Sequence, residues 1–534
     1  MRTANYDYVV VGGGSSGAIV GSRLAEGGAK VLLLEAGGTD RRPDVLIPAG
    51  VVSAYQRLNW KYPVEPDPTR TNSPEAWMAG KVLGGGGSIN SCVYVRGNRA
   101  DFDGWAKLGC SGWDYDSVLP SFKRMESWER GANEYRGGDG PISVKLQGYR
   151  DQANLAYLES ALQAGHPRTE DYNGAIQDGV DLIQVNHRQR GTRSQASREY
   201  LRSVAPKGNL TVQKKAMVHR VLFDGDRAIG VEYRLDGKLE RARVREEVIL
   251  CAGSLSSPKI LMLSGIGPRD TLNEFDIDVV HVNPGVGANL HDHAFLMQRW
   301  HANIPTANKM RASTLLKGLR DYALYGSGML AITMVQVQVM HKTDPARETP
   351  DLQLQFVPVA ITRGVDEDGA FNVQPAKYDG FLASSTLLHP RARGTVSLRS
   401  SDPEAPPLIN YQYLAEEEDV RDIISGAWEV RRIMEQPAIA DLIGEPFEPE
   451  AMCRTDADWK QYAREYVTSS YHPVGTCKMG NDDRSVVDPE LRVNGVKGLR
   501  VADASIMPTV TSGNTNAPAM MIGERAAELI LRSA

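Results

Sequence analysis

The N-terminal stretch from Tyr6 to Glu35 constrains the fold more strongly than any other part of this sequence. A short apolar run, 6–11, leads into glycines with the spacing G-x-G-x-x-G, and an Ala/Leu-rich stretch follows to about Ala25. A second apolar run, 30–34, ends in the acid Glu35. This order of strand, turn, helix, strand and acid predicts a βαβ unit that binds a dinucleotide.

Each residue of this pattern has a physical task. Gly12 permits the tight turn, Gly14 lets a pyrophosphate approach the backbone, and Gly17 lets the helix pack on the strand. The helix N-terminus then points toward the phosphates. Glu35 lies where a carboxylate accepts both hydroxyls of an adenosine ribose. The alternative is a glycine-rich turn in an ordinary α/β domain.

Length and composition set the broad class of protein. The chain has 534 residues, which exceeds a single ordinary core and predicts two domains. The net charge of −5 shows no basic excess for nucleic acid, and no apolar run is long enough to span a membrane. The first residues lead directly into a strand, so no signal peptide is expected. Five scattered cysteines form no metal spacing or disulfide framework, which favours a reducing cytoplasm: Cys92, Cys110, Cys251, Cys453 and Cys477.

A second glycine-rich patch covers residues 80–90 and contains four consecutive glycines, 84–87. Bare backbone N–H groups with wide conformational freedom can cradle a pyrophosphate or a flat ring. The stretch from Ile89 to Val95 looks helical and could present its N-terminus to the same ligand. Taken alone, this patch is equally well explained as a flexible loop.

A β-rich region follows the first two patches. We expect a strand at 209–212 and three more strands at 217–223, 228–233 and 239–244, with Asp-Gly hairpin turns at 224–225 and 236–237. Residues 247–253 read as a buried parallel strand. Ser257 is a plausible N-cap with Pro258 at the first helical position, and the helix ends at Gly265.

These motifs resemble the glucose-methanol-choline (GMC) family of flavoprotein oxidoreductases. Residues 80–97 fit the first signature of that family, and residues 253–267 fit the second at every constrained position. Ala79 stands where relatives usually carry Arg. Ile89 stands where some oxidases carry a histidine bonded to the flavin, so the resemblance implies FAD held non-covalently. The loop 284–293 also fits the family pattern.

The resemblance implies an α/β fold: a Rossmann-type FAD-binding domain with a β-meander, and a substrate-binding domain built on an antiparallel sheet flanked by helices. We expect the FAD-binding domain to comprise 1–150, 191–298 and 463–534, and the substrate-binding domain to comprise 151–190 and 299–462. The resemblance to the family also implies FAD contacts at Gly12, Gly14, Ser15, Ser16, Gly17, Glu35, Ala36, Gly80, Val82, Gly85, Gly86, Asn90, Val93, Val218, Ala252, Gly253, Tyr471, Asp503, Ala504, Asn514, Thr515 and Asn516.

Several further expectations concern local structure. Val218 would meet the adenine through its backbone, or serve as strand core, and the two are compatible. Residues 151–189 read as helix and loop. The alternating runs 335–339 and 352–356 predict strands whose polar face could roof a ligand cavity. Long helices are expected at 416–434 and 456–467, and a last helix at 519–531.

The catalytic expectation also comes from the resemblance. His472, within His-Pro-x-Gly-Thr, stands in the catalytic position of the family, and Asn514 stands where its partner is His or Asn. An imidazole can take the hydroxyl proton of an alcohol, and an amide can bond the substrate oxygen without competing for that proton. Gln336, Tyr471, His472 and Asn514 are expected to contact substrate. Gln336 is a neutral amide in the region where many relatives carry a glutamate. This predicts an uncharged or weakly polar substrate, a primary alcohol or a sugar or polyol, rather than a quaternary ammonium.

Alternatives of function remain open from the sequence. No second G-x-G-x-x-G unit is present, so electrons are expected from an alcohol rather than from NAD(P)H. We favour a dehydrogenase that passes electrons to a quinone or dye over an oxidase that uses O2. The electron transfer is compatible with peripheral contact of the enzyme with a membrane that contains the quinone. A non-redox lyase, a photodecarboxylase or a non-catalytic flavin-binding protein could share the fold. His291 and His293 lack Cys or acidic partners at ligand spacing, which predicts a structural loop rather than a metal site. The oligomeric state is not predicted.

Overall fold

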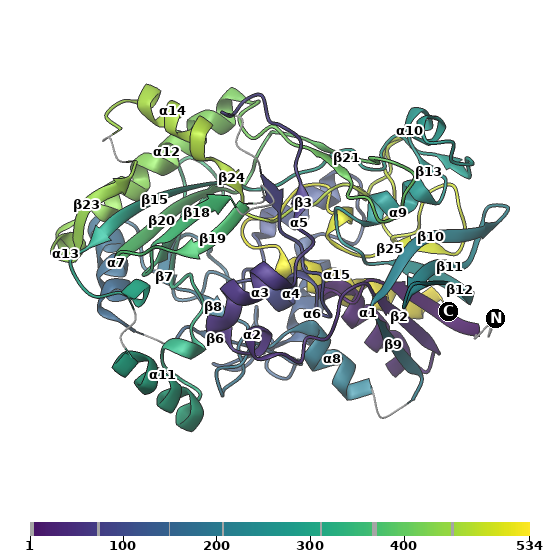
Figure 1. Ribbon diagram of the computed structural model, residues 1–534, viewed down its shortest axis with the longest axis horizontal. Coiled ribbons are helices and arrows are strands. Elements are labelled where there is room, and N and C mark those ends of the chain that lie inside the picture. The colour runs from purple at the N-terminus through teal and green to yellow at the C-terminus, as the bar shows by residue number, and fades with distance from the viewer. Residues whose placement is uncertain are drawn as a thin grey trace.

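The computed structural model describes residues 5–71, 75–148, 150–204, 208–309, 312–365, 371–449 and 453–533. Two seven-stranded sheets organise these residues and lie toward opposite ends of the molecule in Figure 1. Each sheet has its own apolar core. The predicted α/β fold with two sheet-based parts is therefore confirmed.

The first sheet combines a parallel part with an antiparallel meander. Its strand order is β10-β11-β12-β1-β2-β9, with β25 paired to β12. Pairing is parallel through β12, β1, β2 and β9 and antiparallel through β10, β11 and β12, so the long β12 serves both parts. The strands are β1 (Asn5–Val11), β2 (Val31–Glu35), β9 (Leu210–Lys214), β10 (Ala216–Asp224), β11 (Arg227–Leu235), β12 (Lys238–Leu250) and β25 (Leu499–Val501).

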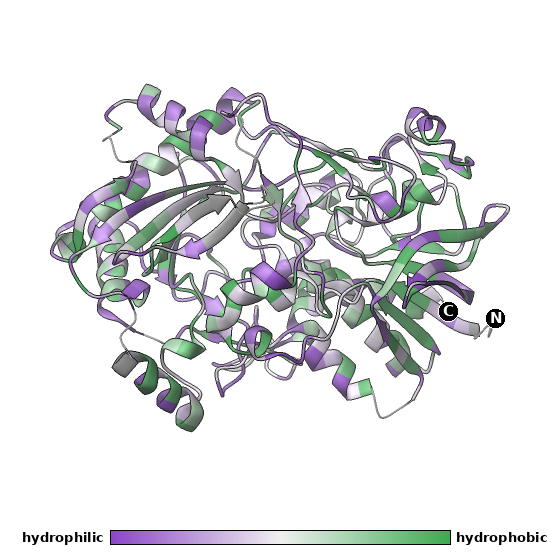
Figure 2. Cartoon of the chain, viewed as in Figure 1, coloured by the Kyte–Doolittle hydropathy of each residue, from purple (hydrophilic) through white to green (hydrophobic). Residues whose placement is uncertain are grey.

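The predicted βαβ unit and both hairpins are confirmed, although the first turn is formed by Gly225 and Asp226, one residue later than expected. Helix α1 (Ser15–Glu26) connects β1 to β2, and Val9 pairs with Leu32 in the parallel register. The central strands are apolar on both faces, as parallel strands covered by helices require. Asp236 and Gly237 both have positive φ, 48° and 78°, which suits the two-residue turn between β11 and β12. Green, apolar strands of this sheet are visible in Figure 2.

The second sheet is antiparallel and has the order β23-β15-β20-β17-β16-β7, with β24 paired to β15. Alternate residues of β17 divide between its two faces: Leu352, Leu354 and Phe356 belong to the apolar core, and Gln353 and Gln355 face the other way. The strands are β7 (Gly179–Leu182), β15 (Ala294–Ala302), β16 (Val337–His341), β17 (Leu352–Val357), β20 (Gly380–Leu387), β23 (Ile443–Glu448) and β24 (Thr468–Ser469).

Helices α7 (Gln152–Gln163) and α12 (Glu417–Met434) cover the apolar face of this second sheet. The stacking of Tyr157 on Phe356, with ring centroids 4.5 Å apart, joins α7 to β17. The opposite face is left for polar side chains and a cavity. The predicted polar roof, and the predicted helices at 416–434 and 456–467, are confirmed; the second is α14 (Asp456–Tyr466).

The remaining described elements are connectors and covering helices. The helices are α2 (Pro43–Leu46), α3 (Val51–Arg57), α4 (Gly86–Ile89), α5 (Arg99–Lys107), α6 (Tyr115–Met125), α8 (Ala196–Val204), α9 (Ser257–Leu263), α10 (Arg269–Glu274), α11 (Ala312–Tyr325), α13 (Pro437–Ala440) and α15 (Asn516–Ser533). The short strands are β3 (Tyr62–Pro63), β4 (Ala76–Trp77), β5 (Glu126–Trp128), β6 (Ile142–Leu146), β8 (Gln184–Val185), β13 (Ile266–Gly267), β14 (His281–Val282), β18 (Ile361–Val365), β19 (Phe371–Pro375), β21 (Thr395–Ser397) and β22 (Leu408–Asn410).

Four local expectations were wrong. The helix near the second glycine patch is α4, and the chain beyond Asn90 is not helical up to Val95. The stretch 151–189 contains strands β7 and β8 besides α7, because tertiary pairing with β16 overrides a weak local pattern. The N-cap of α9 is Ser256 rather than Ser257, with Pro258 inside the first turn. Helix α15 starts three residues before Ala519, since Pro518 is tolerated in a first turn.

Candidate active site

A cavity of about 500 Å³ lies between the polar face of the second sheet and the start of α15. The sheet contributes Phe295 and Met297 from β15, Gln355 and Val357 from β17, and Leu382 and Ser384 from β20. The other walls include residues of α3, of α4, of the loop after β24 and of the start of α15: Val51, Val52, Tyr55, Gly86, Ile89, Tyr471, His472, Asn514, Thr515 and Asn516. We call this the sheet cavity. None of its described lining residues is Asp or Glu.

His472 and Asn514 meet in the wall of the sheet cavity. Nε2 of His472 lies 3.2 Å from Nδ2 of Asn514. Oδ1 of Asn514 accepts a hydrogen bond from Nε2 of Gln353 on β17 at 3.3 Å, and Gln353 also donates to Gln338 on β16. The sheet therefore fixes which end of the Asn514 amide faces His472.

A hydrogen-bonded chain determines the tautomer of His472. Nε2 of His293 lies 3.2 Å from the carbonyl oxygen of Leu388, which can only accept, so this nitrogen carries a proton. Burial and the neighbouring His472 lower the pKa of His293 well below its usual range, so Nδ1 of His293 is left as an acceptor. Nδ1 of His472, 2.9 Å away, must then donate. Nε2 of His472 is consequently the unprotonated nitrogen, and it accepts the hydrogen bond from Nδ2 of Asn514.

Burial lowers the pKa of His472 itself to about 4. The cause is desolvation, which penalises the imidazolium. The side chain is therefore neutral at physiological pH and able to accept a proton.

Asp292, the residue before His293, binds the segment that carries His472. Its carboxylate accepts hydrogen bonds from the backbone N–H of His472 at 2.8 Å and from the hydroxyl of Ser469. The Tyr411 hydroxyl donates to the carbonyl of Asp292 at 2.9 Å. Burial raises the pKa of Asp292 to about 7 despite these bonds. Between Ser469 and His472, the chain turns through a positive φ of 59° at Tyr471, a costly conformation outside glycine.

A second cavity of about 480 Å³ runs along the carboxyl ends of β1, β2 and β12 and is lined by both glycine-rich patches. We call it the nucleotide cavity. It shares several lining residues with the sheet cavity, so the two meet: Ser15, Lys61, Met78, Gly86, Tyr471, Thr515 and Ala519. Ligands of open α/β sheets bind at this edge of the strands.

Comparison with known proteins agrees with this architecture. Family models of the N- and C-terminal parts of GMC oxidoreductases match residues 6–295 and 390–523. The chain belongs to the GMC oxidoreductase family. It is an FAD-dependent enzyme that acts on alcohol-type donors.

Among curated proteins, the chain is 39% identical over 538 residues to the oxygen-dependent choline dehydrogenase of Pseudomonas fluorescens, covering 98% of this chain and 93% of the relative. It is 37% identical to oxygen-dependent choline dehydrogenase 1 of Chromohalobacter salexigens, covering 99% and 95%. Among solved structures, pyridoxine 4-oxidase from Mesorbium loti has a TM-score of 0.88 at 27% identity, covering 98% of each chain. A formate oxidase variant from Aspergillus oryzae has a TM-score of 0.90 at 24% identity, covering 99% and 98%, and this likeness concerns the fold.

The nucleotide cavity fits the adenosine and pyrophosphate of the FAD that this GMC oxidoreductase requires. A Cβ added at Gly14 would meet only the Cα of Gly85, at 3.9 Å, so this backbone is open to a phosphate. Gly12 has φ of 100°, and a Cβ there would lie 2.4 Å from the carbonyl oxygen of Cys251. A Cβ at Gly17 would lie 2.0 Å from the carbonyl oxygen of Gly12. The turn and the helix packing thus both require glycine.

Glu35 lines the nucleotide cavity with its carboxylate already oriented. The oxygens accept hydrogen bonds from the backbone N–H groups of Gly13 at 2.9 Å and Gly37 at 2.6 Å. Burial raises the pKa of Glu35 to about 7, against the lowering effect of these two donors. Each carboxylate oxygen has a further lone pair with which ribose hydroxyls can bond.

The predicted FAD residues divide among three places. The nucleotide cavity is lined by Gly12, Gly14, Ser15, Ser16, Glu35, Ala36, Gly80, Gly85, Gly86, Val218, Ala252, Gly253, Tyr471, Asp503, Ala504 and Thr515. The sheet cavity is lined by Asn90, Val93, Asn514 and Asn516, besides the shared residues. Gly17 and Val82 line neither cavity. Gly17 packs α1 on β1, as expected, whereas Val82 is buried in a small apolar cluster.

Two predicted residues have roles within the chain itself. The Asp503 carboxylate accepts bonds from Gly253 N at 2.8 Å and from the Ser257 hydroxyl at 2.6 Å, and so ties the end of β25 to the turn after β12. Gln336 does not line the sheet cavity: it is fully buried and its Nε2 donates to the carbonyl of Thr333. The structure therefore does not bring Gln336 to His472, and Gln355 occupies the cavity wall instead.

Sequence reasoning missed the partner of His472. The sequence predicts a structural loop at His293, and a His-Asp-His run carries no signal for a contact with a residue 179 positions away. Tyr55, whose ring lies 5.7 Å edge-on from that of Tyr471, falls in a stretch that carries no motif. Among the helices that the structure describes, none is long and apolar enough to cross a membrane.

Proposed function

We propose that this enzyme oxidises an alcohol to an aldehyde or ketone with Nε2 of His472 as the general base. The single observation that carries the proposal is the chain from Leu388 O through His293 to Nδ1 of His472, which leaves the lone pair on Nε2. That nitrogen borders the sheet cavity beside Asn514. A base in this position can take the hydroxyl proton.

The residues perform two tasks in this reaction. A substrate hydroxyl placed between His472 and Asn514 donates its proton to Nε2 of His472 and accepts a hydrogen bond from Nδ2 of Asn514. Bound FAD supplies the acceptor for the hydride that leaves the carbinol carbon. Loss of one proton and one hydride converts the alcohol to the carbonyl product. Afterwards, His472 is protonated, and its low pKa favours release of that proton.

The lining of the sheet cavity supports an uncharged, largely apolar alcohol as substrate. Phe295, Met297, Met334, Val335 and Val357 present apolar surface, and no described lining residue is a carboxylate. A quaternary ammonium would find aromatic rings there but no anion, with the cation Lys61 in the wall. The relatives named as choline dehydrogenases therefore suggest alcohol oxidation here, but not choline as the preferred donor.

Non-covalent attachment of FAD is also proposed. Ile89 ends α4 and lines the sheet cavity, and its aliphatic side chain offers no nucleophile for a bond to the flavin. Helix α15 begins beside the same cavity, so its N-terminal backbone can stabilise negative charge on a reduced ring.

Two electron acceptors remain candidates. The sequence pattern favours transfer to a quinone or dye, and the printed names of the relatives, which carry the words oxygen-dependent, favour O2. An oxidase that releases hydrogen peroxide is therefore the second candidate function.

The test is anaerobic reduction of the purified enzyme with a panel of alcohols that includes choline, primary aliphatic alcohols, benzylic alcohols and polyols. Bleaching of the flavin absorbance by an apolar alcohol, faster than by choline, is the expected result. Absence of bleaching by every alcohol would contradict alcohol oxidation and favour a lyase-type reaction. Air is then admitted: rapid reoxidation with one hydrogen peroxide per flavin identifies an oxidase, and slow reoxidation that a quinone analogue accelerates identifies a dehydrogenase.

A further inference from the structure

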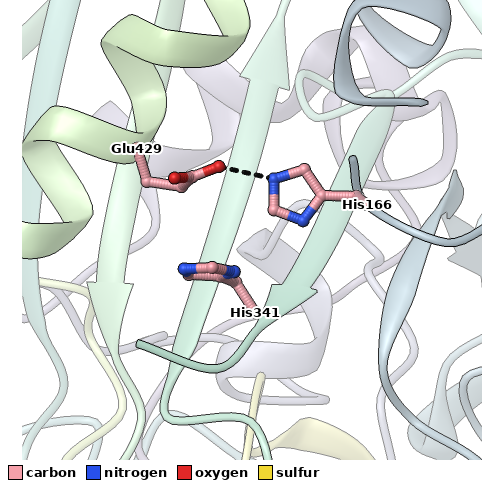
Figure 3. A group of neighbouring side chains, drawn as sticks. All are labelled: His166, His341 and Glu429. Atoms are coloured by element: carbon pink, nitrogen blue, oxygen red, sulfur yellow. Dashed lines mark hydrogen bonds and ion pairs between the residues drawn. The ribbon is translucent and has the colours of Figure 1, made fainter. Parts of the chain in front are cut away.

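Three potential metal ligands converge on the helix-covered side of the second sheet, away from both cavities. His166 follows α7, His341 ends β16, and Glu429 lies in α12 (Figure 3). One donor atom from each lies within 4.8 Å of the others. His166 and Glu429 are only 6% and 8% exposed, and His341 is half-buried. None of the three lines the sheet cavity or the nucleotide cavity, so the proposed oxidation leaves this cluster unexplained.

The bonding within the cluster is incomplete. Nε2 of His166 lies 2.6 Å from Oε1 of Glu429. The His341 ring stands nearly perpendicular to that of His166, with centroids 5.1 Å apart, and no described residue forms a hydrogen bond with the His341 ring. A half-buried imidazole with no hydrogen-bond partner among the described residues, next to a carboxylate and a second imidazole, is a set of side chains suited to a metal ion.

We propose that His166, His341 and Glu429 bind a divalent late transition-metal ion, with Zn²⁺ as the best match. Two imidazoles and one carboxylate suit Zn²⁺. They disfavour Ca²⁺ and Mg²⁺, because these ions prefer oxygen ligands only. Ligands around one tetrahedral Zn²⁺ lie about 3.3 Å apart, given bond lengths of roughly 2.0–2.1 Å. The observed separations, 2.6 Å for one pair and up to 4.8 Å overall, bracket this value, so small side-chain rotations suffice.

Arg432 both competes with the ion and supports it. Its Nε donates to Oε2 of Glu429 at 2.8 Å, and its Nη2 donates to Oε1 at 2.5 Å. Binding at Oε1 requires Nη2 to move away, whereas the bond to Oε2 can persist and orient the carboxylate, as partners of metal ligands commonly do. The nearby cation lowers affinity by charge repulsion. The site is therefore expected to bind Zn²⁺ reversibly rather than to retain it through purification.

A bound ion would join three segments that are distant in the sequence. The loop after α7, the end of β16 and the middle of α12 would share one coordination centre. Because an ion that binds the folded state alone stabilises it by mass action, Zn²⁺ should raise the melting temperature.

The test uses the full FAD-loaded enzyme after treatment with a chelator. Isothermal titration with ZnCl2 should give one ion per chain, accompanied by a rise in melting temperature. His341→Gln and Glu429→Gln should each weaken binding about tenfold or more, because loss of a mere orienting partner already costs that much. Arg432→Met should tighten binding. His281→Gln, a change on β14 outside the cluster, is the matched control and should leave binding unchanged.

Flavin reduction by alcohol should stay at the wild-type rate in every variant, which reports a folded enzyme. Crystals of the wild-type protein soaked in ZnCl2 should show an anomalous zinc peak between the three side chains, which does not depend on any variant folding. No binding, a peak elsewhere, or unchanged affinity in His341→Gln would overturn the proposal.

Discussion

Replacement of His293 by Phe tests whether the proton arrangement of His472 depends on its neighbour. His293 is fully buried, and its Nδ1 lies 2.9 Å from Nδ1 of His472. Phe fills a similar space but has no acceptor, so the Nδ1 proton of His472 would lose its partner. The imidazole could then shift to the tautomer with its proton on Nε2, where no base faces the substrate.

The magnitude follows from the lost hydrogen bond. Leaving one buried donor unsatisfied costs about 1–3 kcal/mol. If that cost appears in the population of the reactive tautomer, the rate of flavin reduction falls about 5- to 150-fold, since about 1.4 kcal/mol corresponds to a factor of ten. The substrate still contacts Asn514 and the apolar walls, so we expect kcat to fall more than KM rises.

The assay is anaerobic stopped-flow bleaching of the flavin by the best alcohol in the panel. His293→Asn is the matched control, because its Oδ1 can occupy the position of Nδ1 and accept the same proton; it should retain a rate within about tenfold of wild type. Flavin content and melting temperature confirm that each variant is folded and loaded. A folded, FAD-loaded His293→Phe enzyme with the wild-type reduction rate would refute the tautomer argument.

Three further predictions follow from the site. His472→Ala should lower kcat by about two to four orders of magnitude with near-normal FAD content, whereas Asn514→Ala should have a milder effect and alter kcat more than KM. Steady-state kinetics measure kcat and KM, and absorbance spectra measure the FAD content. Near-normal turnover of His472→Ala would mean that another residue is the base. Because the pKa of His472 is about 4 and the neutral form is the base, kcat/KM should be level above about pH 5 and fall below it as the imidazole is protonated; a fall centred near pH 7 would contradict this. Acid precipitation should release all flavin into the supernatant, and colour that stays with the protein would contradict the role given to Ile89.

Strongly local patterns predicted the fold well. The glycine spacing at 12–17, the alternation at 352–356 and the Asp-Gly turn at 236–237 each encode their own geometry, because the cause lies within a few neighbouring residues. Strand β7 was not predicted, because its four residues are too few to show a recognisable alternation of apolar and polar side chains. The strand forms through its pairing with β16. The sequence predicts a helix at Ile89–Val95, but strand pairing and a turn hydrogen bond beyond α4 determine the path of this segment.

The site was predicted only as far as a motif specifies it. His472 and Asn514 are placed together, and they were found because each belongs to a recognisable segment. Gln336 was expected in the cavity by approximate alignment, and the pleat of the sheet turned Gln355 into it instead. His293 could not be found this way, because its relation to His472 exists only after the loop at 284–293 is folded against the segment after β24.

The arrangement of Asp292 explains why that relation can be held accurately. Its carboxylate bonds the backbone N–H of His472, and the next residue along, His293, bonds the side chain of His472. Two adjacent residues thus fix both the backbone and the ring of the proposed base, and the pairing of β15 with β24 at Ala294 and Ser469 fixes the two segments to each other. An imidazole restrained at both points loses little entropy when substrate binds, which is how a positioned base contributes to rate. The positive φ at Tyr471 is sustained because these bonds flank it on both sides.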